Sequence, residues 1–416
     1  MLLLLLLIIQ PCTPSWTLRA GERIALQPAA ASPYPPSSPL PLLDLCAAER
    51  WCALHGGKPS HLQAVYRSLF RHGGSLDAPS LQLAGLPRAL SHQLSAAFTA
   101  CASRVVGVVE STDGLKLLVE LASGRRIETV LVLHEHASTG GRRCTVCVSS
   151  QVGCARQCSF CATGTMGAVA QLSAAEILEQ VWLAREVLAA RGERAELRNV
   201  VFMGMGEPLD NFAAVSHALR GLTHQSLFDL SARRITVSTV GASAARIREL
   251  ADAAPRVRLA LSLHAASQPL REQLIPSATA CALPALAAAL DYHALRAAEG
   301  CMVEYLLLRG VNDADEHADE LARFCAARAA AVPPRAAGRA RPGFVNLIPY
   351  NPTAAGALRG YEAPSEERVR TFHARLREVH GIHALIRWKS ASGQDANGAC
   401  GQLVVEQQPA ARSQLA

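Results

Sequence analysis

The chain has 416 residues, of which 50% are hydrophobic and 18% are charged, which is enough material for one large domain and one small one. This composition excludes a disordered chain, and an aromatic content of only 5% favours helices over an all-β fold. The net charge of +7 fits a polyanionic partner without identifying one. Five of the 13 cysteines lie between Cys144 and Cys161, and this local cluster indicates metal or redox chemistry, not a secreted disulfide scaffold.

Residues 1–42 differ in composition from the rest of the chain. They begin with the apolar run MLLLLLLIIQ, too short to span a bilayer, and continue with a Pro-, Ala- and Ser-rich stretch at residues 27–41. This pattern resembles leaders that send proteins to plastids through a secretory step, and the alternative is a start codon placed upstream of the true one. We expect a plastid or other organelle if the leader is real and the cytoplasm otherwise.

Residues 43–140 predict a small N-terminal domain. Apolar residues recur at helical spacing in PSHLQAVYRSLFRHG and again in GLPRALSHQLSAAF, where Pro87 stands near the start of the helix. Residues 105–133 then alternate between apolar and polar, with turns at Gly114 and Gly124. This second pattern predicts a β-meander that follows the helices.

Residues 141–405 predict an α/β core. Amphipathic helical segments such as SAAEILEQVWLAREVLAA separate the strand-like runs, and this alternation indicates a parallel sheet, either open or closed into a barrel. Polar or glycine residues stand at nearly every strand end, where such barrels build their sites. The runs are NVVFMGMGEP, RRITVSTVG, RVRLALSLHA, CMVEYLLLRGVND, FVNLIPYNP and HALIRWKS.

Two further segments have a low-complexity or terminal character. Residues 325–343, CAARAAAVPPRAAGRARPG, contain Arg and Ala but no acidic residue, and we interpret them as a flexible surface insertion. Contact with nucleic acid is the alternative for this basic run. Residues 406–416 are expected to form a disordered tail.

Three cysteines in GCARQCSFCATG carry the strongest chemical signal. Cys154, Cys158 and Cys161 are spaced by three residues and then by two, in the loop that follows the first strand of the predicted barrel. Three thiolates suit a [4Fe–4S] cluster that keeps one iron without a protein ligand. The alternative is a structural zinc site with Cys144 or Cys147 as its fourth ligand, although such sites usually pair their ligands as CxxC.

The CxxxCxxC spacing resembles that of radical SAM enzymes, and MGEPL at residues 205–209 is similar to their GEP motif. The resemblance implies a partial (β/α)6 barrel that holds a [4Fe–4S] cluster on Cys154, Cys158 and Cys161. It also implies S-adenosylmethionine (SAM), bound through its amino and carboxylate groups to the open iron.

Longer strings narrow the resemblance to the RlmN/Cfr family of rRNA adenine methyltransferases. CVSSQVGCARQCSFCATG, GMGEPLDN, ITVSTVG, LALSLHA, NLIPYNP and ACGQL occur in the family's order between about residues 55 and 405. The resemblance implies methylation of adenosine C2 in 23S-type large-subunit rRNA, with tRNA as a further substrate. It also implies that the N-terminal domain helps to grip RNA.

The family resemblance assigns roles to three residues outside the cluster. Cys400 would accept a methyl group from a first SAM, and a second SAM, cleaved at the cluster, would give the radical that activates this methyl group for addition to adenine. Glu128 would remove the ring proton, and Cys147 would release the product by forming a disulfide bond with Cys400. On its own, Glu128 would be interpreted as an ordinary surface residue.

Further positions match the SAM contacts of the family. Gly206 and Glu207 match the site for the amino group, and the others match polar positions around the adenosyl group. Each has a plainer interpretation, as a helix cap for a Ser or Asn or as a core residue for the histidine. These other matching positions are Ser238, Ser262, Leu263, His264 and Asn351.

The sequence departs from the family pattern at three places. TMGAVAQLS lacks an aromatic residue after Met-Gly, Ser392 and Ala396 replace an arginine and an isoleucine, and the segment at 325–343 lengthens a loop. C8 methylation, an RNA-binding protein with a structural cluster, and a radical SAM enzyme for peptides or small molecules remain as alternatives. The expected partners are rRNA and a flavodoxin- or ferredoxin-type electron donor, with a monomeric protein that has no stable membrane association.

Overall fold

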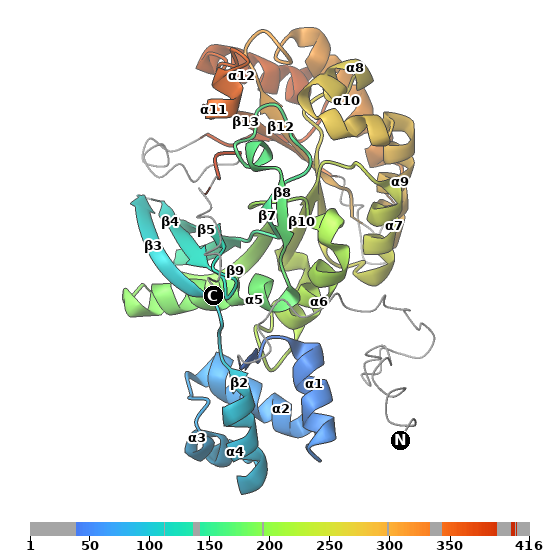
Figure 1. Ribbon diagram of the computed structural model, residues 1–416. Coiled ribbons are helices and arrows are strands. Elements are labelled where there is room, and N and C mark those ends of the chain that lie inside the picture. Colours follow the sequence, from blue (N-terminus) through green and yellow to red (C-terminus); the bar gives the residue numbers. More distant parts are fainter. Residues whose placement is uncertain are drawn as a thin grey trace, which may run out of the picture.

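The computed structural model describes residues 39–111, 113–135, 142–193, 195–297, 299–332, 343–388, 401–403 and 405. Most of this part of the chain is organised around one ten-stranded sheet, in the order β14-β13-β12-β11-β10-β9-β6-β5-β4-β3 (Figure 1). Its strands are β3 (Arg104–Ser111), β4 (Gly114–Glu120), β5 (Arg126–Glu135), β6 (Arg142–Cys147), β9 (Ala195–Phe202), β10 (Ile235–Thr239), β11 (Arg258–Ser262), β12 (Met302–Leu307), β13 (Val345–Pro349) and β14 (Ala384–Ile386).

The sheet has a parallel half and an antiparallel half. All neighbours from β6 through β9 to β14 pair in parallel, and these strands are β6 and the six expected runs, β9 to β14. β3, β4 and β5 form the predicted meander and join β6 through an antiparallel pairing. The meander is therefore continuous with the barrel sheet.

Sequence explains why the parallel strands are central. All five residues of β10, ITVST, are buried, and β-branched residues with both faces covered are typical of parallel sheets. Helices cross over between the strands, and α7 and α9 lie side by side on the outside of the barrel (Figure 1). These helices are α5 (Ala174–Ala190), α6 (Phe212–Thr223), α7 (Ala244–Ala253), α8 (Gln268–Leu274), α9 (Leu283–Ala297), α10 (Asp315–Ala330), α11 (Ala354–Ala357) and α12 (Glu366–Ala374).

Shorter elements complete the core. β7 (Gln151–Gly153) and β8 (Ala168–Gln171) form a small antiparallel pair, and β1 (Leu40–Pro41) pairs in parallel with β2 (Phe98–Thr99). The single-turn elements are η2 (Thr163–Met166), η3 (Pro208–Asn211), η4 (Ala232–Arg234), η5 (Pro276–Ala280) and η6 (Arg375–Val379).

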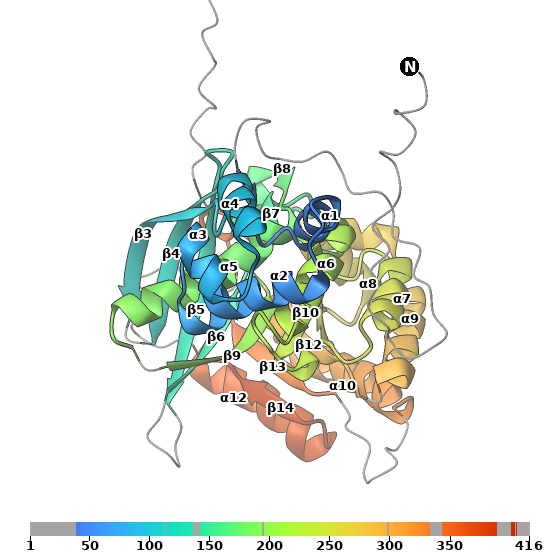
Figure 2. The same cartoon turned by 90° about the horizontal axis from the view of Figure 1, so that it is seen from below.

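The N-terminal helices form a separate layer that packs against α5 and α6, as Figure 2 shows from below. The Phe70 ring meets the Trp182 ring of α5 edge-on, with centroids 4.7 Å apart. The Arg71 guanidinium donates to the Gln225 carbonyl oxygen over 2.8 Å, which ties the layer to the loop after α6. The layer consists of α1 (Leu45–Leu54), α2 (Pro59–Tyr66), η1 (Arg67–Arg71), α3 (Ala78–Leu83) and α4 (Arg88–Ala97).

The structure confirms the predicted order of helices, meander and alternating core. One prediction is partly wrong, because residues 325–330 are the last turns of α10 and not a loop. Alanine and arginine are strong helix formers, so the composition that suggested an insertion suits a helix equally well. The leader at residues 1–38, residues 333–342 and the tail at 406–416 lie outside the described residues.

Across the described ranges, no helix is long and apolar enough to cross a membrane.

Candidate functional site

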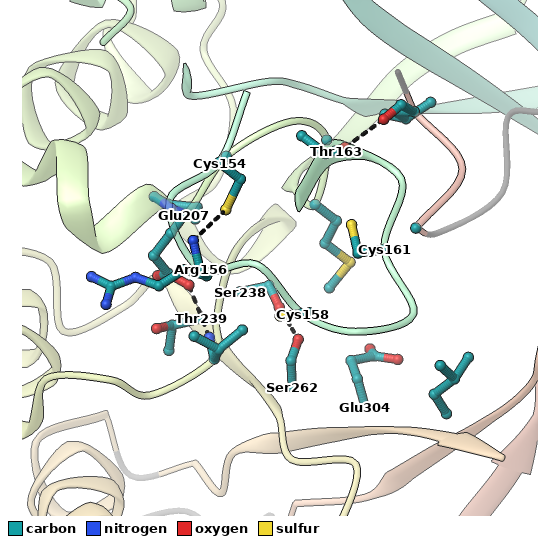
Figure 3. A pocket seen from close by; sticks show the side chains of 18 of the residues that line it. Cys154, Arg156, Cys158, Cys161, Thr163, Glu207, Ser238, Thr239, Ser262 and Glu304 are labelled. Atoms are coloured by element: carbon teal, nitrogen blue, oxygen red, sulfur yellow. Dashed lines mark hydrogen bonds between the residues drawn. The ribbon is translucent and has the colours of Figure 1, made fainter. Parts of the chain in front are cut away.

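A cavity of about 150 Å³ opens at the carboxyl ends of the parallel strands (Figure 3). This is the end of a βα barrel at which the loops leave the strands and sites are built. The lining residues are Cys154, Arg156, Cys158, Phe160, Cys161, Thr163, Phe202, Met203, Gly204, Gly206, Glu207, Pro208, Ser238, Thr239, Val240, Ser262, His264, Glu304, Leu306, Ile348, Gly401 and Leu403.

The cysteine loop runs between β7 and β8 and brings Cys154, Cys158 and Cys161 to one cavity. Its base is fixed by the Cys154 amide, which donates to the Gly167 carbonyl oxygen over 2.7 Å. Gly153 is required here, because its φ is +75° and a Cβ would lie 2.1 Å from the same Gly167 oxygen.

Two thiols of the loop, those of Cys154 and Cys158, are held in the protonated form in the ligand-free protein. Burial raises the pKa of Cys154 to about 12, and burial with the neighbouring thiols Cys161 and Cys154 also raises that of Cys158. Thiolates are the metal-binding form, so a bound cationic group has to offset this cost. Three sulfur ligands in one partly apolar cavity fit a [4Fe–4S] cluster in which three irons each take one thiolate and the fourth takes none.

The structure does not support the zinc alternative. Within the described ranges, no three His, Cys, Asp or Glu side chains converge closely enough to hold a single metal ion. Cys144 is fully buried in β6, and neither it nor Cys147 lines the cavity. Cys144 is therefore accounted for as a small core residue.

Gly206 and Glu207 lie together in the lining of the same cavity. Gly206 has a φ of +101°, and a Cβ would lie 2.6 Å from the Gln151 side chain, so only glycine fits. Burial raises the pKa of Glu207, although its carboxylate accepts hydrogen bonds from the amides of Val240 (2.9 Å) and Leu209 (3.2 Å). A ligand ammonium group would offset the remaining cost of burying this charge.

Ser238, Ser262 and His264 also line the cavity. Ser238 lies inside β10 with its hydroxyl 3.4 Å from that of Ser262, so the helix-cap interpretation of Ser238 is wrong. Burial, with Arg271 nearby, lowers the pKa of His264 to about 3, and its Nδ1 accepts from the Leu306 amide over 3.0 Å. The imidazole is therefore neutral with its proton on Nε2.

Two predicted SAM contacts are close to the site but do not line the cavity. Leu263 is fully buried, and its amide donates to the Glu304 carbonyl oxygen over 3.1 Å. Asn351 is buried in the loop after β13. Leu263 follows β11 and Asn351 follows β13, and each of these strands contributes another residue to the cavity lining, Ser262 and Ile348.

Cys147 and Glu128 belong to the neighbouring strands β6 and β5. Cys147 is half-buried at the carboxyl end of β6, in register with Val201 and Val130. The Glu128 side chain is 6% exposed and forms an ion pair with Lys116 (2.7 Å between Nζ and Oε1), so its interpretation as a surface residue is wrong. Neither side chain lines the cavity in this structure.

Cys400 lies outside the described residues, but the residues that follow it reach the site. The Ala162 amide of the cysteine loop donates to the Gly401 carbonyl oxygen over 2.8 Å, and Gln402 donates to the Pro352 carbonyl oxygen over 3.0 Å. Within the described part of the chain no two cysteines form a disulfide bond, so the predicted disulfide of Cys147 is not supported.

Sequence reasoning missed two charged residues of the cavity, Arg156 and Glu304. Glu304 lies in the middle of β12 and is 7% exposed. A single glutamate within the apolar run CMVEYLLL was the available signal, because buried parallel strands rarely carry a charge.

Comparisons with known proteins agree with this geometry. Residues 148–322 match the Radical SAM superfamily. The dual-specificity RNA methyltransferase RlmN of Oleidesulfovibrio alaskensis is 42% identical over 300 residues, which cover 72% of this chain and 77% of that protein. The ribosomal RNA large subunit methyltransferase N of Nitrosopumilus maritimus is 38% identical, with 76% and 85% of the two chains covered.

A solved structure gives the same result for the fold. A radical SAM methyltransferase from Sphaerobacter thermophilus superposes with a TM-score of 0.74 at 35% sequence identity. The match covers 88% of this chain and 99% of the other.

Proposed function

We propose that this chain, which belongs to the RlmN family of radical SAM RNA methyltransferases, methylates C2 of an adenosine in large-subunit rRNA and an adenosine in tRNA. The observation that carries the proposal is the shared cavity. Three cysteines of one loop face the carboxylate of Glu207, and Gly401, the neighbour of Cys400, hydrogen-bonds to the same loop.

Cys154, Cys158 and Cys161 would hold the [4Fe–4S] cluster, and Glu207 would bind the ammonium group of SAM. When bound, the cluster supplies the electron that cleaves SAM and starts radical chemistry. The neutral His264, with its proton on Nε2, can donate a hydrogen bond to the adenosyl group.

Cys400 would carry the methyl group on its sulfur, and two SAM molecules would be used per methylation. Glu128 would take the proton released from the adenine ring, because a carboxylate is both the form that pairs with Lys116 and the form that accepts a proton. Cys147 would then attack the Cys400 sulfur and release the product. For this step the Cys147 thiol, which is not among the described residues that line the cavity, has to reach the Cys400 sulfur.

The RNA substrate has to present an unstacked base. A base inside a helix cannot reach a cavity at the end of a barrel, so the target adenosine would be splayed out. A flavodoxin- or ferredoxin-type protein is proposed as the electron donor.

Nucleoside mass spectrometry of rRNA and tRNA tests the proposal. Reconstituted protein with SAM, reductant and unmodified RNA should produce 2-methyladenosine, whereas Cys400→Ala should produce none. Formation of 8-methyladenosine would instead assign C8 methylation to the chain. Unmodified RNA with a fully loaded cluster would contradict the proposal.

A further inference from the structure

A row of polar side chains crosses the floor of the cavity on four adjacent parallel strands. Ser262 of β11 is in register with Glu304 of β12, which is in register with Asn346 of β13. Ser238 of β10 continues the row through its 3.4 Å contact with the Ser262 hydroxyl. Positions buried on both faces of a parallel sheet are usually apolar, so a continuous polar row indicates a ligand.

Glu304 is the only acidic member of this row. Its Oε1 accepts a hydrogen bond from the Asn346 amide nitrogen over 2.9 Å, and no described residue donates to its Oε2. Figure 3 shows the carboxyl group directed into the cavity, on the opposite side from Glu207. The buried carboxylate therefore keeps one oxygen available to a molecule in the cavity.

The orientation of the Glu304 carboxyl group is fixed by Asn346, which is itself held by Arg387. The Arg387 guanidinium donates from Nε to the Asn346 Oδ1 over 3.1 Å, so the Asn346 amide nitrogen has to face Glu304. Burial raises the pKa of Glu304 to about 7, against the opposing effects of the Asn346 bond and the Arg387 charge. A hydrogen-bond donor supplied by a ligand would offset much of the free-energy cost of burying the charged carboxylate.

We infer that Glu304 binds the vicinal hydroxyls of the adenosyl ribose, so that the cavity selects a ribonucleoside with an intact diol. The inference rests on the proposed function, because it requires SAM as the ligand. Carboxylates commonly accept hydrogen bonds from ribose hydroxyls in nucleotide sites. The neighbouring Ser262 and His264 line the same part of the cavity and can bind the rest of the adenosyl group.

Calorimetric binding of two ligands to the cluster-loaded protein tests this inference. S-adenosylhomocysteine carries the diol, and its 2′,3′-dideoxy analogue lacks it. In the unmodified protein, S-adenosylhomocysteine should bind about tenfold to hundredfold more tightly, the range expected for hydrogen bonds to a charged group. Glu304→Gln should bring the two affinities together, and Glu304→Asp should restore part of the difference.

Glu299→Gln is the matched control, because Glu299 pairs with Arg258 at the other end of the barrel strands. It should keep the full preference for the diol. Equal affinity of the unmodified protein for the two ligands would overturn the inference even if no Glu304 variant folded. An equal loss for both ligands in Glu304→Gln would also overturn it. Failure to bind S-adenosylhomocysteine at all would refute the proposed function itself.

Discussion

The carboxylates of the antiparallel half of the sheet and those of the parallel half have different kinds of partner. In the meander, Glu120 is held between Arg104 and Arg126, and Glu128 pairs with Lys116. In the parallel half, the buried carboxylates of Glu207 and Glu304 accept hydrogen bonds from amide groups and form no ion pair with a described residue. Glu120 and Glu128 thus pair with cations of the meander itself, whereas Glu207 and Glu304 keep hydrogen-bonding capacity for a ligand.

Two serine substitutions, one in the cysteine loop and one in the core of the sheet, give the largest expected difference. Cys158→Ser should abolish the iron content and brown colour of anaerobically reconstituted protein, because a cluster held by three thiolates does not survive the loss of one. Cys144→Ser, in the core of β6, should leave the iron content unchanged. Equal iron content in the two variants would contradict the assignment of the cysteine loop.

Lys116→Met tests whether the meander depends on its internal pairs. The variant leaves the 6% exposed Glu128 side chain without its ammonium partner, which should lower the free energy of unfolding by about 3–5 kcal/mol. Arg104→Met removes a side chain that is 73% exposed and should cost less than about 1 kcal/mol. Anaerobic chemical unfolding measures the free energy of unfolding of both variants. A similar decrease in the two would contradict the larger contribution expected of the buried Lys116–Glu128 pair.

The junction between the meander and α5 should show a pH dependence. Glu179 accepts from the amides of Ala102 (2.8 Å) and Ser103 (3.1 Å), and burial raises its pKa to about 7 from 4.5. Between these values the folded protein holds a proton that the unfolded chain has released, so stability falls as pH rises from about 4.5 to about 7 and then levels off.

Glu179→Gln removes this titrating group. The slope of unfolding free energy against pH should become less negative by up to about 1.4 kcal/mol per pH unit between pH 5 and 7. Unfolding curves at pH 5, 6, 7 and 8 measure the slope. An unchanged slope would show that Glu179 is ionised in the folded protein throughout this range.

Glu207→Gln tests the ligand-facing half directly. Removing the negative charge should weaken binding of S-adenosylhomocysteine about tenfold or more, because its ammonium group loses a charge-assisted hydrogen bond. Calorimetry on the cluster-loaded variant measures the change, and Glu272→Gln on α8 serves as the control. Unchanged affinity would separate Glu207 from the ammonium site.

Local patterns in the sequence account for much of the fold and for the centre of the site. The buried strands are apolar runs that end in glycine or polar residues, and the cysteine spacing marks its own loop. The pairing of β5 with β6 was not predictable, because it joins segments whose alternation does not specify a partner. Glu304 was missed for a related reason, since its role depends on its register with Ser262 and Asn346.

The hydrogen bond from Ala162 to Gly401 connects the middle of the chain to its end. A ribosome makes the cysteine loop long before Gly401 and Leu403, which form part of the cavity wall. The side of the cavity formed by these two residues is therefore the last part of the site to be completed during synthesis.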